Sequence, residues 1–219
     1  MQEYLPILKK CPLFEGISTE ELSGLLVCLG AKIINAQKGQ TVLQEGDRTD
    51  SIGILLSGCV QLVQSDYYGN RSIVTQIGPS QLFGEAYAFS PAQTLPVSIV
   101  AEEGSRILML DSRRFTASCS KACSFHNRVI TNLLYLVSDK ILMLHQKIQV
   151  TSQRTTRSKL MTYLNLQAKI HGSSAFSIPF DRQTLADYLE VDRSGLSAEI
   201  SKLRAEGILE NERNQFRLL

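Results

Sequence analysis

The sequence predicts an α+β protein with a β-rich N-terminal part, a long helix and a small C-terminal helical domain. From about Ala31 to Leu110, short β-type runs such as "SIGILLSG", "CVQLVQS" and "VSIVAEE" are separated by glycines, a pattern typical of an antiparallel barrel or jelly roll. Apolar residues then recur at steps of four and three from Ile130 to Ile148, as in a long amphipathic helix. Two short helical patterns follow Asp181 with almost nothing between them.

The composition is that of an ordinary soluble protein. The chain has 219 residues, of which 43% are hydrophobic and 20% charged, and its net charge is +2. No apolar run approaches the roughly 18 residues that a membrane span needs, and the N-terminus lacks a signal-peptide pattern. We therefore expect a cytoplasmic protein without a membrane partner. The small basic excess lies in the C-terminal part, with 10 basic against 8 acidic residues in 151–219, which weakly supports a nucleic-acid partner.

The predicted elements fall into two domains. The segment "GISTEELSGLL" starts the first domain with a short helix, because Ser18 precedes Glu21 by the spacing of a capping box. The β-rich part and a helix over about 122–150 complete a domain of residues 1–150. Polar residues from Thr151 to Ser158 interrupt the apolar pattern, so we expect a hinge there and a second domain of residues 151–219.

The long helix carries two apolar faces. Leu133, Leu136 and Met143, with Lys140 among them, form a face that can cover the end of the barrel. Because two apolar faces need two partners, we expect the other face to pair with a second copy in a parallel coiled coil. The alternative is a single amphipathic helix packed inside a monomer. The predicted dimer stripe consists of Ile130, Leu134, Val137, Ile141, Leu144 and Ile148.

The C-terminal patterns predict a winged helix-turn-helix. Asp181 and Asp192 are suitable N-caps for two helices, and Ala186 in the first is small enough to let the second approach closely. Glu190 stands in the turn, where a left-handed backbone conformation favours glycine. The ending "AEGILENERNQFRLL" predicts a hairpin that turns near 211–214 and forms the wing.

Two helices joined so tightly leave the first turn of the second helix exposed, where it can enter the major groove of DNA. Arg193 can donate two hydrogen bonds to the O6 and N7 atoms of guanine. Arg182 and Gln183, at the start of the first helix, are suited to a phosphate. The alternative is an ordinary helical hairpin with solvated charges. The predicted DNA-binding residues are Arg182, Gln183, Arg193, Ser194, Ser197 and Ala198.

The order of these elements, with the segments "LFGEAYAFS" and "RQTLADYLEVDRSGLSAEISKLRAEGIL", resembles the cyclic-AMP receptor protein/fumarate-nitrate regulator (Crp/Fnr) family of bacterial transcription factors. The resemblance covers essentially the whole chain. It implies a double-stranded β-helix of cyclic-nucleotide-binding-like fold and a homodimer that binds a pseudo-palindromic operator, with recognition helices roughly 34 Å apart. It also makes RNA polymerase a candidate partner. Ser194 and Ala198 replace a Glu and an Arg of the family's best-known recognition pattern, so we expect a different half-site.

The family's cyclic-AMP site is only half present. In the family's cyclic-AMP-binding members, a Gly-Glu-Leu segment is followed by an Arg-Ser pair that holds the cyclic phosphate. Gly84 and Glu85 match, but Leu95 and Pro96 replace the pair, so the counter-charge is missing. We expect no response to cyclic AMP unless Lys140 supplies the charge. Two alternatives remain: an uncharged or aromatic effector in an apolar chamber, or no ligand at all. The chamber would be lined by Tyr87, Phe89, Leu95, Leu133 and Leu136. The predicted effector-pocket residues are Gly84, Glu85, Tyr87, Leu95, Pro96, Leu133, Leu136 and Lys140.

No cofactor, metal site or enzymatic activity is predicted. An iron–sulfur cluster needs four thiolates, usually near the N-terminus, where only Cys11 and Cys28 occur. No histidine precedes His126, which argues against both a haem sensor and a cupin-like metalloenzyme. Cys119 and Cys123 lie one helical turn apart and are either small apolar residues or a redox pair.

The resemblance implies control by a population shift, in which an effector in the barrel favours one arrangement of the long helices and the hinge. A constitutive DNA-binding dimer and a cysteine-based redox sensor are the alternatives.

Overall fold

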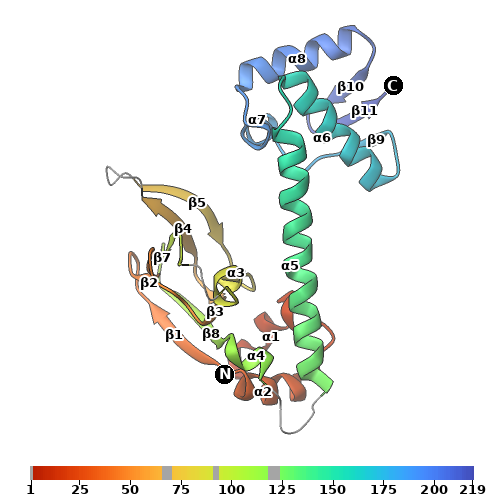
Figure 1. Cartoon of the computed structure of the whole chain (residues 1–219). Helices are drawn as coiled ribbons and strands as arrows, with labels where there is room; N and C mark the ends of the chain where they lie inside the picture. The colour runs from red at the N-terminus through yellow and green to blue at the C-terminus, as the bar shows by residue number, and fades with distance from the viewer. Residues whose placement is uncertain (1, 66–70, 91–93, 118–123) are drawn as a thin grey trace. The chain divides into compact units, whose positions relative to one another are not determined.

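The computed structural model describes residues 2–65, 71–90, 94–117 and 124–219 (Figure 1). Contacts between residues divide the chain into two compact units, Met1–Ser138 and Asp139–Leu219. The division falls inside helix α5 (Ser124–Thr151), earlier than the predicted break after residue 150. The predicted domain boundary thus stays a prediction, and each unit is described by itself.

The strands of the first unit form two facing antiparallel sheets (Figure 1). Their bounds are β1 (Lys32–Ala36), β2 (Thr41–Leu43), β3 (Ser51–Ser57), β4 (Val60–Ser65), β5 (Arg71–Ile77), β6 (Leu82–Phe83), β7 (Ser98–Ala101) and β8 (Ser105–Asp111). Within the described residues, the orders are β1-β8-β3-β6 and β2-β7-β4-β5. Because β1 and β2, or β3 and β4, follow one another in the chain but lie in different sheets, the chain winds between them. The predicted jelly roll, or double-stranded β-helix, is confirmed.

The interior of the roll explains one of its glycines. Leu55, Val60 and Ile107 are fully buried in an apolar cluster that also contains Phe83. Gly53 on β3 pairs with Phe83 on β6, and a Cβ atom at position 53 would lie only 2.0 Å from Cζ of that ring. Only glycine allows the ring to lie against the strand in this way.

Short helices and the first part of α5 enclose a second core. These elements are the 3₁₀ helices η1 (Gln2–Tyr4) and η2 (Pro12–Phe14), and the α-helices α1 (Leu5–Leu8), α2 (Thr19–Cys28), α3 (Glu85–Ala88) and α4 (Arg113–Thr116). Phe14, Leu25, Phe115 and Val129 are buried together in this core. Helix α2 begins with the predicted capping box, because the Ser18 side chain accepts from the backbone N–H of Glu21 at 3.2 Å and Glu21 accepts from that of Ser18 at 2.8 Å.

The second unit is a winged helix-turn-helix around one core. Its elements after α5 are α6 (Thr156–His171), β9 (Ala175–Ser177), α7 (Arg182–Leu189), α8 (Arg193–Ala205), β10 (Leu209–Glu212) and β11 (Gln215–Leu218). The strands form an antiparallel sheet of order β10-β11-β9. Val150 of α5 is fully buried with Leu160, Leu185 and Leu196, so the last turn of α5 belongs to this core.

Among the described residues, no helix has both the length and the apolar character to cross a membrane.

Candidate nucleic-acid interface

Helices α7 and α8 both begin at a capped end. The Asp181 side chain accepts from the N–H of Thr184 at 2.7 Å, and the Asp192 side chain accepts from the N–H of Gly195 at 2.9 Å. The Thr184 backbone bond is the main cause that lowers the pKa of Asp181, and the Ser194 hydroxyl is the main cause at Asp192. Both predicted caps are confirmed, and they fix where each helix starts.

The turn between the helices is short and strained. Glu190 adopts the left-handed conformation, with φ 54° and ψ 55°, where the sequence predicts it and where glycine is usual. Ala186 and Leu189 of α7 and Leu196 of α8 are completely buried. The two helices therefore meet through small and apolar side chains, which sets the angle of α8.

The first two turns of α8 leave four predicted residues exposed. Arg193, Ser194, Ser197 and Ala198 all face solvent. Ser194 donates its hydroxyl hydrogen to Asp192, so this side chain completes the cap of α8. Within the part of the chain that the structure describes, the Arg193 guanidinium makes no hydrogen bond or ion pair, and its charge is only the last of the causes that lower the pKa of Asp181, after the bonds from Thr184. Of these four exposed side chains, that of Arg193 has the most hydrogen-bond donors available to an external ligand.

The start of α7 presents a different arrangement. The guanidinium of Arg182 lies over the ring of Phe216 on β11, 5.9 Å from its centroid, and burial lowers its pKa. Its Nη1 atom is buried and has no hydrogen-bond partner among the described residues. Gln183 is exposed, and its amide donates to Asp187 at 2.9 Å. The stacking of Arg182 on the wing could not be inferred from the sequence, because the two residues are far apart in the chain.

The wing is a two-residue hairpin. Register pairs Glu212 with Gln215, so the turn consists of Arg213 and Asn214, within the predicted range. Arg213 has a φ of 52°, which is unusual for a residue with a side chain. It is exposed at the tip of the hairpin and was not among the residues predicted to bind DNA. An arginine in "NERN" between two short strands is the signal that could have identified it.

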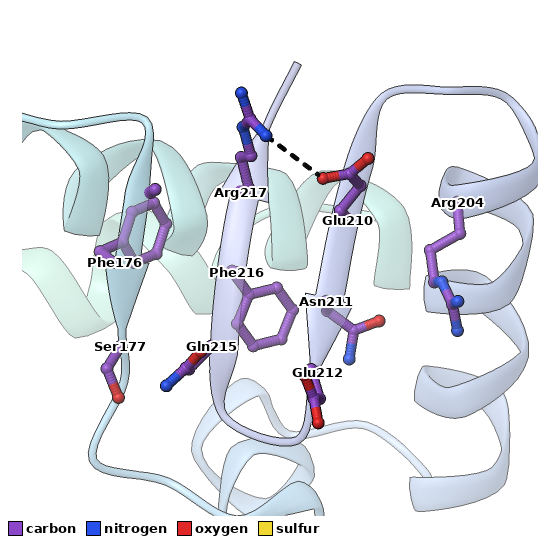
Figure 2. Close-up of a pocket in the computed structure, with 10 residues that line it drawn as sticks. Phe176, Ser177, Arg204, Glu210, Asn211, Glu212, Gln215, Phe216 and Arg217 are labelled. Carbon is purple, nitrogen blue, oxygen red and sulfur yellow. Dashed lines mark ion pairs between the residues drawn. The ribbon is translucent and has the colours of Figure 1, made fainter.

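A hollow of about 710 Å³ lies over the wing sheet and the end of α8. Figure 2 shows Phe216 at its centre, Arg204 projecting from α8 on one side, and the ion pair between Arg217 and Glu210 on the strands. The two charged groups of that pair are 3.7 Å apart. Asn211 Oδ1 is buried and lacks a partner among the described residues. The hollow is wide and open, and none of the predicted DNA-binding residues lines it.

The predicted effector residues of the roll are brought together only in part. Gly84 adopts a left-handed conformation, with φ 81°, and ends β6 directly before the buried Glu85, which is 7% exposed. Leu95 is buried at 2% exposure. Its backbone N–H donates to the carbonyl of Asp47, and its carbonyl accepts from the N–H of Gly46. Pro96 is exposed. Leu133 and Leu136 pack on the core that α1 and α2 share, and Lys140 belongs to the other compact unit.

Tyr87 lines a separate cavity of about 550 Å³ at the junction of α3 and α4. Its other lining residues include Arg48, Asp50 and Arg113, and Arg113 lies 3.6 Å from Asp50. Phe89, which the sequence also placed in the predicted chamber, lines this cavity too, whereas Leu95, Leu133 and Leu136 do not. The chamber predicted from the sequence and this cavity therefore share only Tyr87 and Phe89.

The predicted dimer stripe on α5 is exposed over most of its length. Leu134, Ile141, Leu144 and Ile148 are 58–65% exposed, which is unusual for large apolar side chains on one helix. Ile130 and Val137 are partly buried against the core of the first unit. Of the second predicted face, Leu133 is buried at 7% exposure while Met143 is 67% exposed.

Cys11 and Cys59 have raised pKa values, which disfavours their reactive thiolate forms. Burial raises the pKa of Cys11 to about 11, and desolvation with Glu102 nearby raises that of Cys59. Cys119 and Cys123, the predicted redox pair, lie outside the described residues. No cluster of three or more metal-binding side chains occurs in the described ranges.

Two family models match the chain. A cyclic nucleotide-binding domain matches residues 33–122, and a Crp-like helix-turn-helix domain matches residues 158–219. The chain belongs to the Crp/Fnr family. Its members are DNA-binding transcription regulators, so this protein is a regulator and not an enzyme. The helix-turn-helix model begins within α6 and contains α7, α8 and the wing.

Individual relatives agree with this assignment. The transcriptional activator FnrL of Cereibacter sphaeroides is 24% identical over 79% of this chain and 70% of its own length. The CRP-like cAMP-activated global transcriptional regulator of Mycobacterium tuberculosis is 31% identical over only 39% of this chain and 37% of that protein. The crystal structure of the Thermus thermophilus catabolite activator protein covers 95% of this chain and 93% of its own, with 22% identity and a TM-score of 0.56. This Crp/Fnr chain therefore shares the fold of that structure from end to end.

Proposed function

We propose that the protein is a homodimeric, sequence-specific regulator that reads DNA mainly with Arg193 and responds to an uncharged effector. The observation that carries the DNA-reading part is the first turn of α8, where capping fixes the helix and leaves the Arg193 guanidinium exposed. A fixed helix with a free guanidinium at its start suits a guanine in the major groove. The proposal places the protein in the cytoplasm, with its operator on the chromosome.

The remaining predicted residues take supporting roles. Arg182 is only partly buried, so the accessible part of its guanidinium can donate to a phosphate oxygen. Gln183 is exposed beside it and can contact the same phosphate group. Ser197 can donate to either a base or a phosphate, and the methyl group of Ala198 can contact that of a thymine. Ser194 acts through the cap of α8.

A second copy of the chain is the proposed partner of α5. Ile141, Leu144 and Ile148 follow the spacing of a coiled-coil seam and are at least 58% exposed. Two such helices side by side would cover this stripe and carry two reading motifs, as a pseudo-palindromic operator requires. RNA polymerase is a proposed further partner when the dimer is on DNA.

The proposed effector carries no phosphate. Leu95 is buried and Pro96 has no N–H group, so neither position supplies a cation or donor for a cyclic phosphate. A phosphate buried beside these residues would need a counter-charge. An uncharged metabolite avoids this cost. The competing proposal is a constitutive dimer, in which the roll only supports dimerisation.

Selection from a random duplex library tests the reading function. The purified protein should enrich a pseudo-palindrome with half-sites about one helical turn apart. Failure to enrich any sequence would contradict the proposed reading function. Enrichment of a single half-site would contradict the proposed dimer. Ultracentrifugation of Ile141→Asp should then give a monomer, while Leu142→Asp, a neighbour that is 60% exposed and off the stripe, should stay dimeric.

Native mass spectrometry of the protein from its own host tests the effector. A dimer with added mass identifies a ligand, and that ligand should change the affinity for the selected operator. Cyclic AMP should change neither the melting temperature nor the operator affinity. If cyclic AMP does act, the Lys140→Ala variant decides whether Lys140 supplies the missing charge. A bare dimer whose affinity no metabolite pool alters supports the constitutive alternative.

A further inference from the structure

Two lysines from helices other than α7 and α8 hold the C-terminal end of α7. Lys147 of α5 donates to the carbonyl oxygen of Tyr188. Lys159 of α6 donates to those of Leu189 at 3.1 Å and Glu190 at 3.3 Å. The last carbonyls of a helix lack partners within the helix and carry a partial negative charge. Two ammonium groups, which we call the lysine clasp, therefore satisfy the end of α7.

The lysine clasp lies against the strained residue of the motif. Glu190 has the left-handed conformation that directs the chain from α7 into α8. Its carboxylate lies 3.4 Å from the Lys147 ammonium, and its carbonyl faces that of Lys159. Since glycine is absent at this turn, contacts from surrounding helices help to maintain its conformation, beside the bonds from its own N–H to the carbonyls of Ala186 and Asp187. Lys147 and Lys159 supply such contacts from two different helices.

Lys147 is itself fixed by aromatic packing. Its ammonium lies 4.6 Å from the centroid of the Tyr188 ring, in cation–π contact. Tyr188 packs on Tyr163 at 5.3 Å and on Phe180 at 5.1 Å between ring centroids. The Lys147 side chain is 31% exposed, so this is not a freely solvated lysine. It joins α5 to the end of α7 through three contacts.

Lys147 also follows the exposed stripe of α5 closely. Leu144 precedes it by one helical turn, and Ile148 is the next residue; both are at least 62% exposed. A partner that binds this stripe contacts the same turn of α5 that holds α7. The position of the turn before α8 therefore depends on α5 rather than on the helix-turn-helix alone.

We propose that Lys147 is a positioning residue, which fixes the turn before α8 to the dimer helix and so presents Arg193 at operator spacing. This rests on the proposed reading function. Lys147 touches no DNA in this proposal. Its removal should therefore weaken binding to the selected operator without weakening binding to random DNA.

The test compares Lys147→Met, which keeps the length of the side chain, with Lys147→Arg, which keeps a cation. Lys169→Met is the matched control, because Lys169 is an exposed lysine on α6 of the same unit. Fluorescence anisotropy over a range of salt gives the affinity for the selected operator and for a random duplex. We expect at least a tenfold loss of operator affinity for Lys147→Met, an unchanged salt slope, and recovery of most of the affinity in Lys147→Arg.

Three results would overturn the proposal. The first is operator affinity within twofold of the wild type in Lys147→Met. The second is a salt slope smaller by about one, which marks a lost phosphate contact. The third is loss of folding, seen by circular dichroism, that Lys147→Arg does not reverse. If the wild type selects no operator, the reading function itself fails; if it does and Lys147→Met binds it normally, only this inference fails.

Discussion

Helices α7 and α8 bury their apolar residues in one core and begin with the same kind of cap, but they differ in what else contacts them. The end of α7 is held by the lysine clasp, and Arg182 at its start lies on the wing. The first turn of α8 is held by its cap and by the buried Leu196, while the guanidinium of Arg193 makes no hydrogen bond or ion pair with another described residue. One helix is fixed at both ends so that the other can present free donors. The proposed DNA-reading surface thus combines the exposed face of α8, whose opposite face is buried in the core, with a neighbouring helix that is held at both ends.

Enlarging an alanine side chain should have the most different effects on stability in the two helices. Ala186 of α7 is fully buried, whereas Ala198 of α8 is exposed. Ala186→Leu overpacks the helix crossing and should lower the free energy of unfolding by roughly 1–3 kcal/mol. Ala198→Leu should change it by less than about 0.5 kcal/mol. Urea unfolding of both variants measures this. Equal losses in the free energy of unfolding would mean that position 198 of α8 is packed as tightly as position 186 of α7.

Arg193→Ala should leave stability nearly unchanged but reduce base discrimination. The expected loss is roughly 1–3 kcal/mol at one symmetric base pair. Arg204→Ala, an exposed arginine at the far end of α8, is the control and should not alter base preference. Binding to operators with each base substituted in turn measures the effect. A uniform loss over all sequences would instead make Arg193 a phosphate contact.

Lys159→Met should destabilise the second unit without altering base preference. The variant leaves the carbonyls of Leu189 and Glu190 without their charged donor, so we expect a loss of about 1 kcal/mol, reduced by solvent access to the site. Thermal unfolding followed by circular dichroism measures it, with Lys169→Met as the control. A melting temperature equal to that of the wild type would show that the carbonyls of α7 need no cation from α6.

Low pH should reduce the stability that the N-caps of α7 and α8 provide. We expect this to be the smallest of the effects described here. The pKa values of Asp181 and Asp192 lie below the ordinary 3.8, so their carboxylates stabilise the folded form above that pH. That stabilisation is lost as pH falls through the lowered folded-state values. Serine at both positions keeps a cap without a titrating group. The difference in melting temperature between wild type and this double variant should therefore change only below about pH 4, and a change near neutral pH would contradict it.

Local signals predicted much of this architecture. The caps at Asp181 and Asp192 and the left-handed Glu190 follow from residue types within a few positions, and all three are confirmed. Strand β9 escaped prediction because three residues carry too little alternation. Its pairing with β11 depends on partners distant in the chain.

Long-range contacts account for the rest of what the sequence did not predict. The sequence placed Lys147 and Lys159 in no site, since their acceptors are backbone carbonyls on another helix. Arg182 was predicted to contact phosphate, but its stacking on Phe216 depends on how the wing folds back. The roll could be predicted from glycine-separated strands, whereas the cavity beside Tyr87 forms only when α3 and α4 meet.

The close approach of Phe83 to Gly53 in the roll bears on how this sequence can change over evolutionary time. Any side chain at position 53 would overlap the ring, and a smaller residue at position 83 would open a void against the bare strand. Each substitution alone is harmful, and the two together restore the volume. We therefore expect positions 53 and 83 to covary among relatives, with a larger residue at one accompanied by a smaller residue at the other.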